Sequence, residues 1–283
     1  MKKFKEVLMK IIFLIAACVS IISVVLICFF LFSKGIPAIS KIGVTEFLLG
    51  KQWKPSSDLY GIFPMIIGSI YVTAGAIIVG VPTGVLCAVF MAKFCPKSIY
   101  SILKPATELL AGVPSIVYGY FGLVVIVPFM QKVFPETSGK GILTASILLG
   151  IMILPTVIGV SESAIRAVDN SYYEGALALG ATHEVSVFKT VVPAAKSGIL
   201  AGVILGVGRA IGETMAVIMI AGNQAVVPGS ILDGVRTMTA NIVLEMGYAT
   251  DLHREALIAT GVVLFVFILI INLCFSILKR KES

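Results

Sequence analysis

An arginine and a glutamate lie four residues apart inside a long apolar segment of the sequence. The segment reads SGILAGVILGVGRAIGETMAVIMIAGN from Ser197 to Asn223, and Arg209 and Glu213 are its only charged residues. A guanidinium group can donate two parallel hydrogen bonds to a carboxylate or to another oxyanion. The pair therefore indicates either a buried ion pair or a group that binds an anion.

The chain around this pair is far more apolar than a soluble domain. Of its 283 residues 58% are hydrophobic and 13% are charged, and the mean hydropathy is +1.04. A membrane-spanning helix needs about 20 mostly apolar residues. We therefore expect an all-α, polytopic membrane protein with six spans. The predicted spans run over Ile11 to Phe32, Phe63 to Ala92, Pro105 to Met130, Gly141 to Val160, Gly198 to Gly222 and Ala256 to Leu278.

Six spans place both termini on one side of the membrane. That side has the larger share of lysine and arginine, which predicts that it is the cytoplasmic side. The net charge is +7, but the basic residues flank the apolar runs, so we expect no binding of nucleic acid. The five cysteines form no CxxC pair and have no neighbouring histidine, so neither a disulfide framework nor a metal site is expected.

Glycine pairs with a spacing of four residues occur in three places. They are Gly80 with Gly84, Gly202 with Gly206, and Gly208 with Gly212. Small residues at this spacing let two membrane helices approach closely. Ordinary helix packing is a sufficient explanation for all three pairs.

The depth of Arg209 decides which roles it can have. If the fifth span begins near Gly198, Arg209 lies about 16 Å into the bilayer. A lipid-facing charge there costs about 2.5 to 3.5 kcal/mol on insertion scales. Glu213 follows one helical turn later and is expected on the same face. Two interpretations stay open: an ion pair that joins helices, and a water-accessible anion path in which Glu213 holds the guanidinium.

Hydroxyl groups could line the same path. Ser115, Tyr118 and Thr214 are candidates, although hydroxyls within spans more often bond to the backbone or to a neighbouring helix. Glu108, at the predicted start of the third span, is interpreted as a carboxylate at a helix start rather than as a gate. Trp53 and Tyr60 flank the second span and are interpreted as anchors at the membrane interface.

The loop over residues 161–197 has the pattern of two short helices. Ser171 and Glu174 form a predicted capping box at the start of the first helix. Gly180 can end that helix in a left-handed conformation.

The second helix of the loop is expected to begin at Thr182, which is a plausible N-cap. Val185, Phe188 and Val192 then fall on one face, and Pro193 is expected to interrupt the helix. The loop should therefore form a helix, turn, helix projection.

This loop resembles the EAA motif in the membrane subunits of ABC importers. Glu174, Ala176, Gly180 and Pro193 match the motif in type and spacing, whereas Gly175, Thr190 and Val192 depart from it. In that family the projection is the coupling helix that docks on a cytoplasmic ATPase. The resemblance therefore implies a coupling role for Glu174, Ala176, Gly180, Thr182 and Pro193.

Three longer segments are similar to the permease of bacterial high-affinity phosphate importers, in its PstC-type form. They are LLAGVPSIVYGYFGL from Leu109, GILTASILLGIMILPT from Gly141, and the segment that contains Arg209. The resemblance implies a type I ABC importer permease fold and a role in translocation for Arg209 and Glu213. It divides the chain into an N-terminal anchor with an extracytoplasmic loop, 1–60, and a permease domain, 61–283, that contains the loop 161–197.

The same resemblance implies the partners. They are a homologous PstA-type permease, a PstB-type ATPase dimer and an extracytoplasmic PstS-type phosphate-binding protein, assembled in the lipid of the bacterial cytoplasmic membrane. The sequence has no Walker A motif, so the chain is expected to be a transport subunit and not an enzyme. ATP and Mg²⁺ are expected on the partner ATPase, with no cofactor bound by this chain.

Two alternatives stay open at this stage. The first is a permease for another oxyanion, such as sulfate or molybdate. The second is a carrier or channel that works without ATP. An intramembrane hydrolase has little support, because no Ser-His or metal arrangement is placed and no catalytic residue is predicted.

Overall fold

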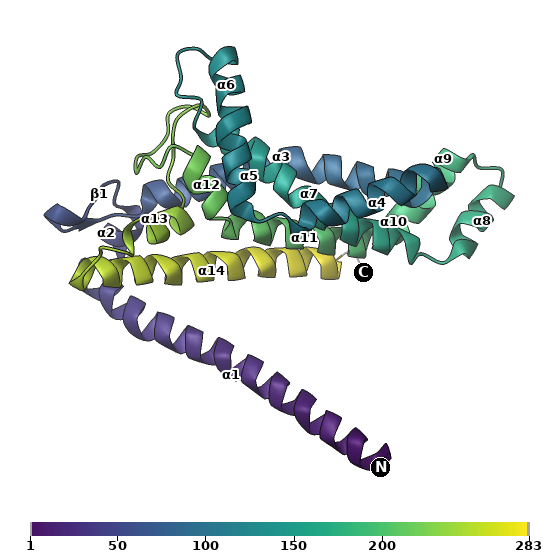
Figure 1. Cartoon of the computed structure of the whole chain (residues 1–283), viewed down its shortest axis with the longest axis horizontal. Coiled ribbons are helices and arrows are strands. Elements are labelled where there is room, and N and C mark those ends of the chain that lie inside the picture. The colour runs from purple at the N-terminus through teal and green to yellow at the C-terminus, as the bar shows by residue number, and fades with distance from the viewer. Residues whose placement is uncertain (1, 282–283) are drawn as a thin grey trace.

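The computed structural model describes residues 2–281, and most of them are helical (Figure 1). The longer helices are α1 (Lys2–Ile42), α3 (Phe63–Val89), α4 (Lys97–Gly112), α7 (Ile142–Arg166), α11 (Lys196–Gly212) and α14 (Asp251–Lys281). The shorter ones are α2 (Val44–Leu49), α5 (Ser115–Phe121), α6 (Val127–Val133), α8 (Asn170–Ala178), α9 (His183–Ser186), α10 (Val192–Ala194), α12 (Met215–Ile220) and α13 (Met238–Glu245).

Short irregular elements connect these helices. Three π-helical segments, η2 (Phe90–Phe94), η3 (Gly122–Ile126) and η4 (Val187–Val191), extend α3, join α5 to α6, and join α9 to α10. A small antiparallel hairpin pairs β1 (Trp53–Lys54) with β2 (Leu59–Tyr60) around the 3₁₀ turn η1 (Pro55–Ser57).

Within the described residues, five helices are long and apolar enough to cross a membrane. They are Glu6–Ile42, Phe63–Phe94, Ser115–Val133, Ile142–Arg166 and Asp251–Cys274. The number rises to six if the bent pair His183–Ala194 and Lys196–Gly212 is counted as one span. The prediction of an all-α, multi-span chain is thus confirmed, while the predicted ends of several spans are wrong.

The third span begins later than predicted. Pro105 and Glu108 lie in α4, which ends at Gly112, and the membrane helix begins at Ser115 after a break at Val113 and Pro114. Proline disfavours a helical conformation in the residue before it, which explains why the helix stops at this point. Glu108 is therefore not at the start of a span, and its side chain is largely exposed, 3.9 Å from Lys104 Nζ.

The fourth and fifth spans also differ from the prediction. Helix α7 continues to Arg166, so the loop predicted over residues 161–197 begins inside this helix. The predicted fifth span breaks into α11 and α12, because Glu213 has an extended backbone with ψ of 130°. Gly212, Glu213 and Thr214 thus separate two helical pieces.

The core of the protein lies around α7, which packs against α3 on one side and α11 on another. In the most apolar stretch of α7 about two thirds of the residues are buried inside the protein. In the corresponding stretch of α1 none are buried. In Figure 1, α3, α7, α11 and α14 run along the long axis of the molecule, whereas α5 and α6 rise away from them. Helix α1 diverges from α14 toward the N-terminus.

The N-terminal region contributes to a second core. Phe47, Trp53 and Tyr60 are buried together with Met238 and Leu257 from the C-terminal part of the chain. The interpretation of Trp53 and Tyr60 as interfacial anchors is therefore wrong, since these two rings pack edge to face inside this cluster. The division into 1–60 and 61–283 stays a prediction.

Close helix packing explains two of the three glycine pairs. A Cβ atom at Gly80 would lie 2.7 Å from the carbonyl oxygen of Gly150 on α7, and one at Gly206 would lie 2.8 Å from Val157. Gly84 and Gly202 are similarly crowded. A Cβ at Gly208 or Gly212, in contrast, would have no described atom within 4 Å. Within the described part of this chain no helix packs against that third pair, whose glycines border open space near Arg209.

The contact between α3 and α7 gives a first prediction. Gly80→Val should destabilise the protein by about 1 to 3 kcal/mol, because its side chain must push the α7 backbone away. The measurement is the thermal unfolding midpoint of the purified protein in detergent.

Gly208→Val is the matched control, since its side chain would enter open space. Equal unfolding midpoints for the two variants would contradict the close approach of α3 and α7 at Gly80.

Candidate functional site

A helical hairpin, α8 with α9 and α10, projects from one end of the molecule (Figure 1). The first helix begins two residues before the predicted start. Asp169 is its N-cap and accepts a hydrogen bond from the Ser171 backbone amide at 2.8 Å. Glu174 instead accepts from the side-chain amide of Asn170. The predicted Ser171 and Glu174 capping box is therefore wrong, because an earlier and equally good capping residue precedes it.

Charge contributes to this cap. The hydrogen bonds from Ser171 lower the pKa of the exposed Asp169 carboxyl below its usual range. A carboxyl with a lowered pKa stabilises the fold above its ordinary pKa, and this stabilisation is lost as the pH falls through the lowered value. The cap is therefore fully formed at neutral pH.

The turn of the hairpin forms as predicted. Gly180 has φ of +86°, the left-handed conformation that favours glycine. The Ala181 amide donates to the Ala176 carbonyl and the Gly180 amide to the Leu177 carbonyl, at 3.1 and 2.9 Å, which closes the end of α8. Thr182 caps the second helix and accepts from the Val185 amide at 3.4 Å. The predictions for Gly180 and Thr182 are confirmed.

The second helix differs from the prediction in two respects. Other side chains are buried than the predicted ones, and Pro193 does not interrupt the helix at the predicted point. A π-helical turn, in which the Val192 amide donates to the Val187 carbonyl, precedes Pro193. This wider turn accommodates Pro193, and the helix ends one residue after it, at Ala194. The chain then bends by 68° into α11.

The π-helical turn also changes which side chains point inward. Val187 and Val191 are buried against Ala88, Val89 and Ile165, in the cluster at the ends of α3 and α7. Val185 and Phe188, two of the three residues on the predicted apolar face, are exposed instead, and the turn residue Leu179 is 91% exposed. Glu174 and Thr182 are exposed as well. The hairpin therefore presents apolar and polar groups outward.

An aromatic contact secures the hairpin to the body. The Tyr173 hydroxyl and His183 Nδ1 are 2.7 Å apart, and the His183 ring packs edge to face on Phe94 at 4.8 Å. Sequence reasoning assigned no role to these three residues. Their contacts fix the hairpin to the end of α3.

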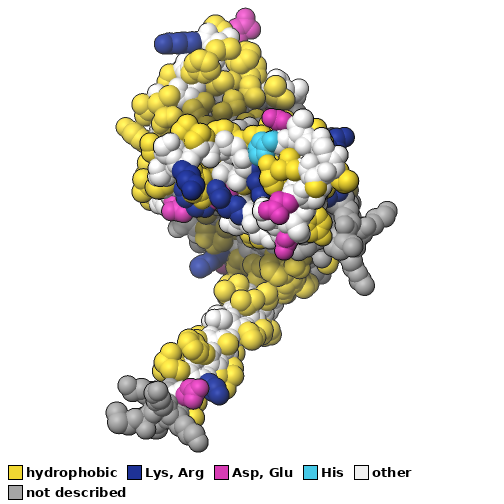
Figure 2. All heavy atoms as spheres, turned by 90° about the vertical axis from the view of Figure 1, so that its right-hand side faces the viewer, with side chains coloured by type: hydrophobic (Ala, Val, Ile, Leu, Met, Phe, Trp, Pro, Cys, Tyr) yellow, Lys and Arg dark blue, Asp and Glu magenta, His cyan; other side chains and the backbone are white. Residues whose placement is uncertain are grey.

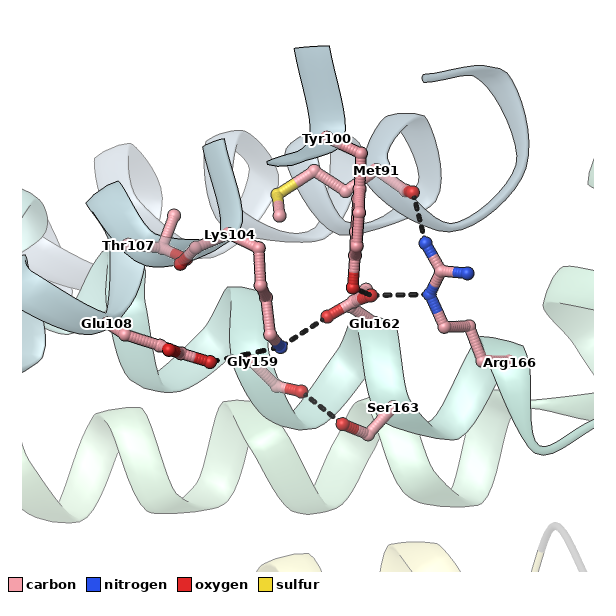
Figure 3. A network of polar contacts seen from close by, with 9 residues as sticks. All are labelled: Met91, Tyr100, Lys104, Thr107, Glu108, Gly159, Glu162, Ser163 and Arg166. Carbon is pink, nitrogen blue, oxygen red and sulfur yellow. Dashed lines mark hydrogen bonds and ion pairs between the residues drawn. The ribbon is translucent and has the colours of Figure 1, made fainter. Parts of the chain in front are cut away.

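A buried carboxylate lies close to the base of the hairpin (Figure 3). Glu162 on α7 is 1% exposed and bonds to Lys104 Nζ at 2.7 Å, to the Tyr100 hydroxyl at 2.8 Å and to Arg166 Nε at 2.5 Å. Arg166 also donates to the Met91 carbonyl at 2.8 Å. We refer to these five residues as the Glu162 network. The hydrogen bond that Lys104 donates to Glu162 raises the pKa of the Lys104 ammonium group above its usual range.

The sequence contained a signal for this network that our prediction did not use. Glu162 and Arg166 are spaced as an i,i+4 pair, as are Tyr100 and Lys104. This spacing favours a helix that continues beyond Val160. The apolar run ends there, however, so the span was predicted to end with it.

Arg209 lies in the last turn of α11 and is half-buried. Its Nη1 atom lies 3.5 Å from the Thr156 hydroxyl on α7, a long and weak contact. In the described part of the chain it joins no ion pair with Glu213. The predicted shared helical face is wrong, because α11 ends at Gly212, one residue before Glu213.

Glu213 is engaged with the helix break itself. Its carboxylate accepts from the Ala216 amide at 3.2 Å, at the start of α12, and its carbonyl accepts from the Thr239 hydroxyl at 3.1 Å. The guanidinium of Arg209 therefore keeps most of its donors uncommitted to the described part of the chain.

The three candidate hydroxyls have different surroundings. The Tyr118 side chain is buried, and its hydroxyl donates to the Leu110 carbonyl of α4 at 2.8 Å. The Thr214 hydroxyl donates to the Gly212 carbonyl at 3.2 Å, and Ser115 is half-buried at the start of α5. Tyr118 thus bridges the break between α4 and α5.

Solved structures define the class of this fold. A chain of a bacterial alginate ABC transporter, solved with its alginate-bound periplasmic protein, superposes with a TM-score of 0.63 at 14% identity, over 94% of each chain. A chain of the MetNI methionine ABC transporter gives 0.57 at 18% identity, over 79% of this chain and 94% of that one. The fold is that of a membrane subunit of an ABC transporter, in the type I arrangement.

Sequence comparison defines the family. Residues 80–283 match the family model described as binding-protein-dependent transport system inner membrane component. A probable ABC transporter permease protein of Bacillus subtilis, YqgH, is 38% identical over 99% of this chain and 93% of its own length. The phosphate transport system permease protein PstC of Mesorhizobium japonicum is 34% identical over 85% and 80%. The chain belongs to this family of multi-pass transport permeases, as the resemblance implied.

The geometry of the turn gives a second prediction. Gly180→Val should loosen the hairpin by about 1 to 2 kcal/mol, because a β-branched residue is strained at φ of +86°. Amide hydrogen exchange over residues 170–194 should become faster.

Gly175→Ala is the control, since a Cβ there would have no described atom within 4 Å and Gly175 lies within α8. Gly180→Asn should retain more protection than Gly180→Val, because asparagine tolerates this conformation. Unchanged exchange in Gly180→Val would contradict the observed turn.

Proposed function

We propose that this chain is one membrane subunit of an ATP-driven importer of inorganic phosphate, with Arg209 in the translocation path. The single observation behind this proposal is a guanidinium within a membrane-spanning region that joins no described ion pair. Such a charge has to meet water, a partner subunit or an anion, because lipid is too costly. Phosphate oxygens fit the planar donor fork of arginine.

The helix break beside Arg209 supports the same role. Irregular backbone at membrane depth is tolerated where protein buries it or where it lines a water-filled cavity. Gly212 is exposed, and Glu213 and Thr214 are half-exposed, so the break is open on one side of this chain. We infer that this side faces the path, shared with a homologous PstA-type permease. The relatives named PstC favour phosphate as the substrate.

The projecting hairpin supports a coupling role. Leu179, Val185 and Phe188 are exposed on it, although one side of the Phe188 ring lies against Phe94. A groove on a PstB-type ATPase dimer would cover them, and Glu174, Ala176, Gly180, Thr182 and Pro193 would shape the docking surface. ATP and Mg²⁺ would be bound by that ATPase, and this chain would hydrolyse no ATP.

The orientation follows from the distribution of charge. The N-terminal part of α1 and the C-terminal part of α14 both run toward the side of the molecule where the hairpin lies (Figure 1). Figure 2 looks onto this end, where lysine and arginine side chains gather among polar atoms. By the positive-inside rule we place the hairpin and both termini in the cytoplasm. A PstS-type binding protein would then deliver phosphate at the opposite face.

The experiment that tests this function is reconstitution of the chain with a homologous permease, ATPase and binding protein in liposomes. Phosphate uptake should require ATP, and excess sulfate or molybdate should compete poorly. Uptake without ATP would favour a carrier or channel, and strong competition by molybdate would favour the other oxyanion.

Arg209 gives the third prediction. Arg209→Gln should lower phosphate uptake about 10- to 100-fold, since a charged hydrogen bond contributes about 1.5 to 3 kcal/mol. The assembled complex should keep its ATPase activity.

Arg254→Gln, which removes an exposed arginine at the start of α14, is the matched control and should transport normally. Normal uptake by Arg209→Gln would refute the path role of this residue.

A further inference from the structure

Helix α4 contacts the body of the protein through polar side chains. It contains no buried residue, yet it lies along α7 at the cytoplasmic end proposed above (Figure 1). Two of its side chains, Tyr100 and Lys104, reach the carboxylate of Glu162 (Figure 3). The Glu162 network therefore joins α4 to α7 through two polar side chains.

The charges in the network explain why this attachment is firm. A buried carboxylate is costly unless cations and hydrogen bonds compensate it. Glu162 receives one cation from α4, Lys104, and one from its own helix, Arg166. The guanidinium of Arg166 also stacks on the Tyr100 ring at 4.4 Å. Separation of α4 from α7 would leave the carboxylate with fewer donors in a buried place.

One side of the network leads to the hairpin. Arg166 is the last residue of α7, and the hairpin begins three residues later at its N-cap, Asp169. Arg166 also holds the Met91 carbonyl in η2, the segment whose Phe94 ring contacts His183 of the hairpin. A displacement of the hairpin therefore acts directly on Arg166.

The other side of the network leads toward the membrane helices. From Lys104, α4 continues to Leu110, whose carbonyl accepts the Tyr118 hydroxyl of α5 across the break at Pro114. Helix α5 in turn packs against α12, which follows the break next to Arg209. The contacts thus form a continuous connection from the hairpin to the region of Arg209.

We propose that Glu162 is a positioning residue for transport: it makes α4 move with the hairpin and so transmits the movement of the ATPase to the third span. This inference rests on the proposed function. If Glu162 had a purely structural role, its loss would lower assembly and ATP hydrolysis together with transport. If Glu162 transmits movement, its loss should lower transport while ATP hydrolysis continues.

The test uses the assembled complex and Lys104→Met, which removes the α4 cation and leaves Arg166 on Glu162. Phosphate uptake should fall about 10-fold or more, while ATP hydrolysis stays within about 2-fold. Lys97→Met, an exposed lysine on the same helix, should leave both unchanged, and Lys104→Arg should restore much of the uptake.

A second measurement does not depend on phosphate. Spin labels at Ser101→Cys on α4 and Ser171→Cys on the hairpin, in a chain whose native cysteines are replaced, report the distance between these elements. The distance should stay constant when the wild-type complex binds an ATP analogue and should change in Lys104→Met.

The outcomes separate the two proposals. If the wild-type complex shows no ATP-dependent uptake, the proposed function fails, whatever the distance measurement gives. If wild-type uptake is normal and Lys104→Met transports normally, or loses uptake and hydrolysis in equal proportion, the role of Glu162 is refuted. An unchanged label distance in Lys104→Met would also refute it.

Discussion

A positive charge within a membrane-spanning region is the constraint on which the rest of this structure depends. Arg209 cannot face lipid without a large cost, and α11 ends before Glu213 could neutralise it along a shared face. The glycines around it, Gly208 and Gly212, border open space instead of a packed helix. Charge, helix break and open space thus occur together, which is the arrangement expected where an anion passes.

The second feature of the molecule is the connection of this region to a projecting hairpin. The hairpin is fixed to the body by buried valines and by the contact of His183 with Phe94, and it follows directly from the end of α7. Its outer surface presents both apolar and polar groups, so its inner and outer faces have separate roles. The Glu162 network adds α4 to this rigid end. A movement imposed on the hairpin therefore reaches the spans through defined side chains.

Much of the fold follows from the sequence. Long apolar runs predicted a chain of several membrane helices, and Gly180 and Thr182 predicted the hairpin turn and its cap. These predictions are confirmed, whereas the predicted ends of several spans are wrong. The errors arise where tertiary contacts override local pattern. Hydropathy alone does not reveal that α11 stops at Gly212, nor that Pro193 is accommodated by a π-helical turn. Glu162 was missed because its partners on α4 are about 60 residues away in sequence and meet it only in the fold.

The central claim is that the break beside Arg209 lines a water-filled path. The most direct measurement is the reaction of a membrane-impermeant thiol reagent with Gly212→Cys, in an assembled complex whose native cysteines are replaced. A side chain at this position enters open space, so Arg209 and the fold are preserved. The account predicts modification in at least one nucleotide state and slower modification with phosphate present. A thiol that stays unreactive in every state of the cycle would contradict it.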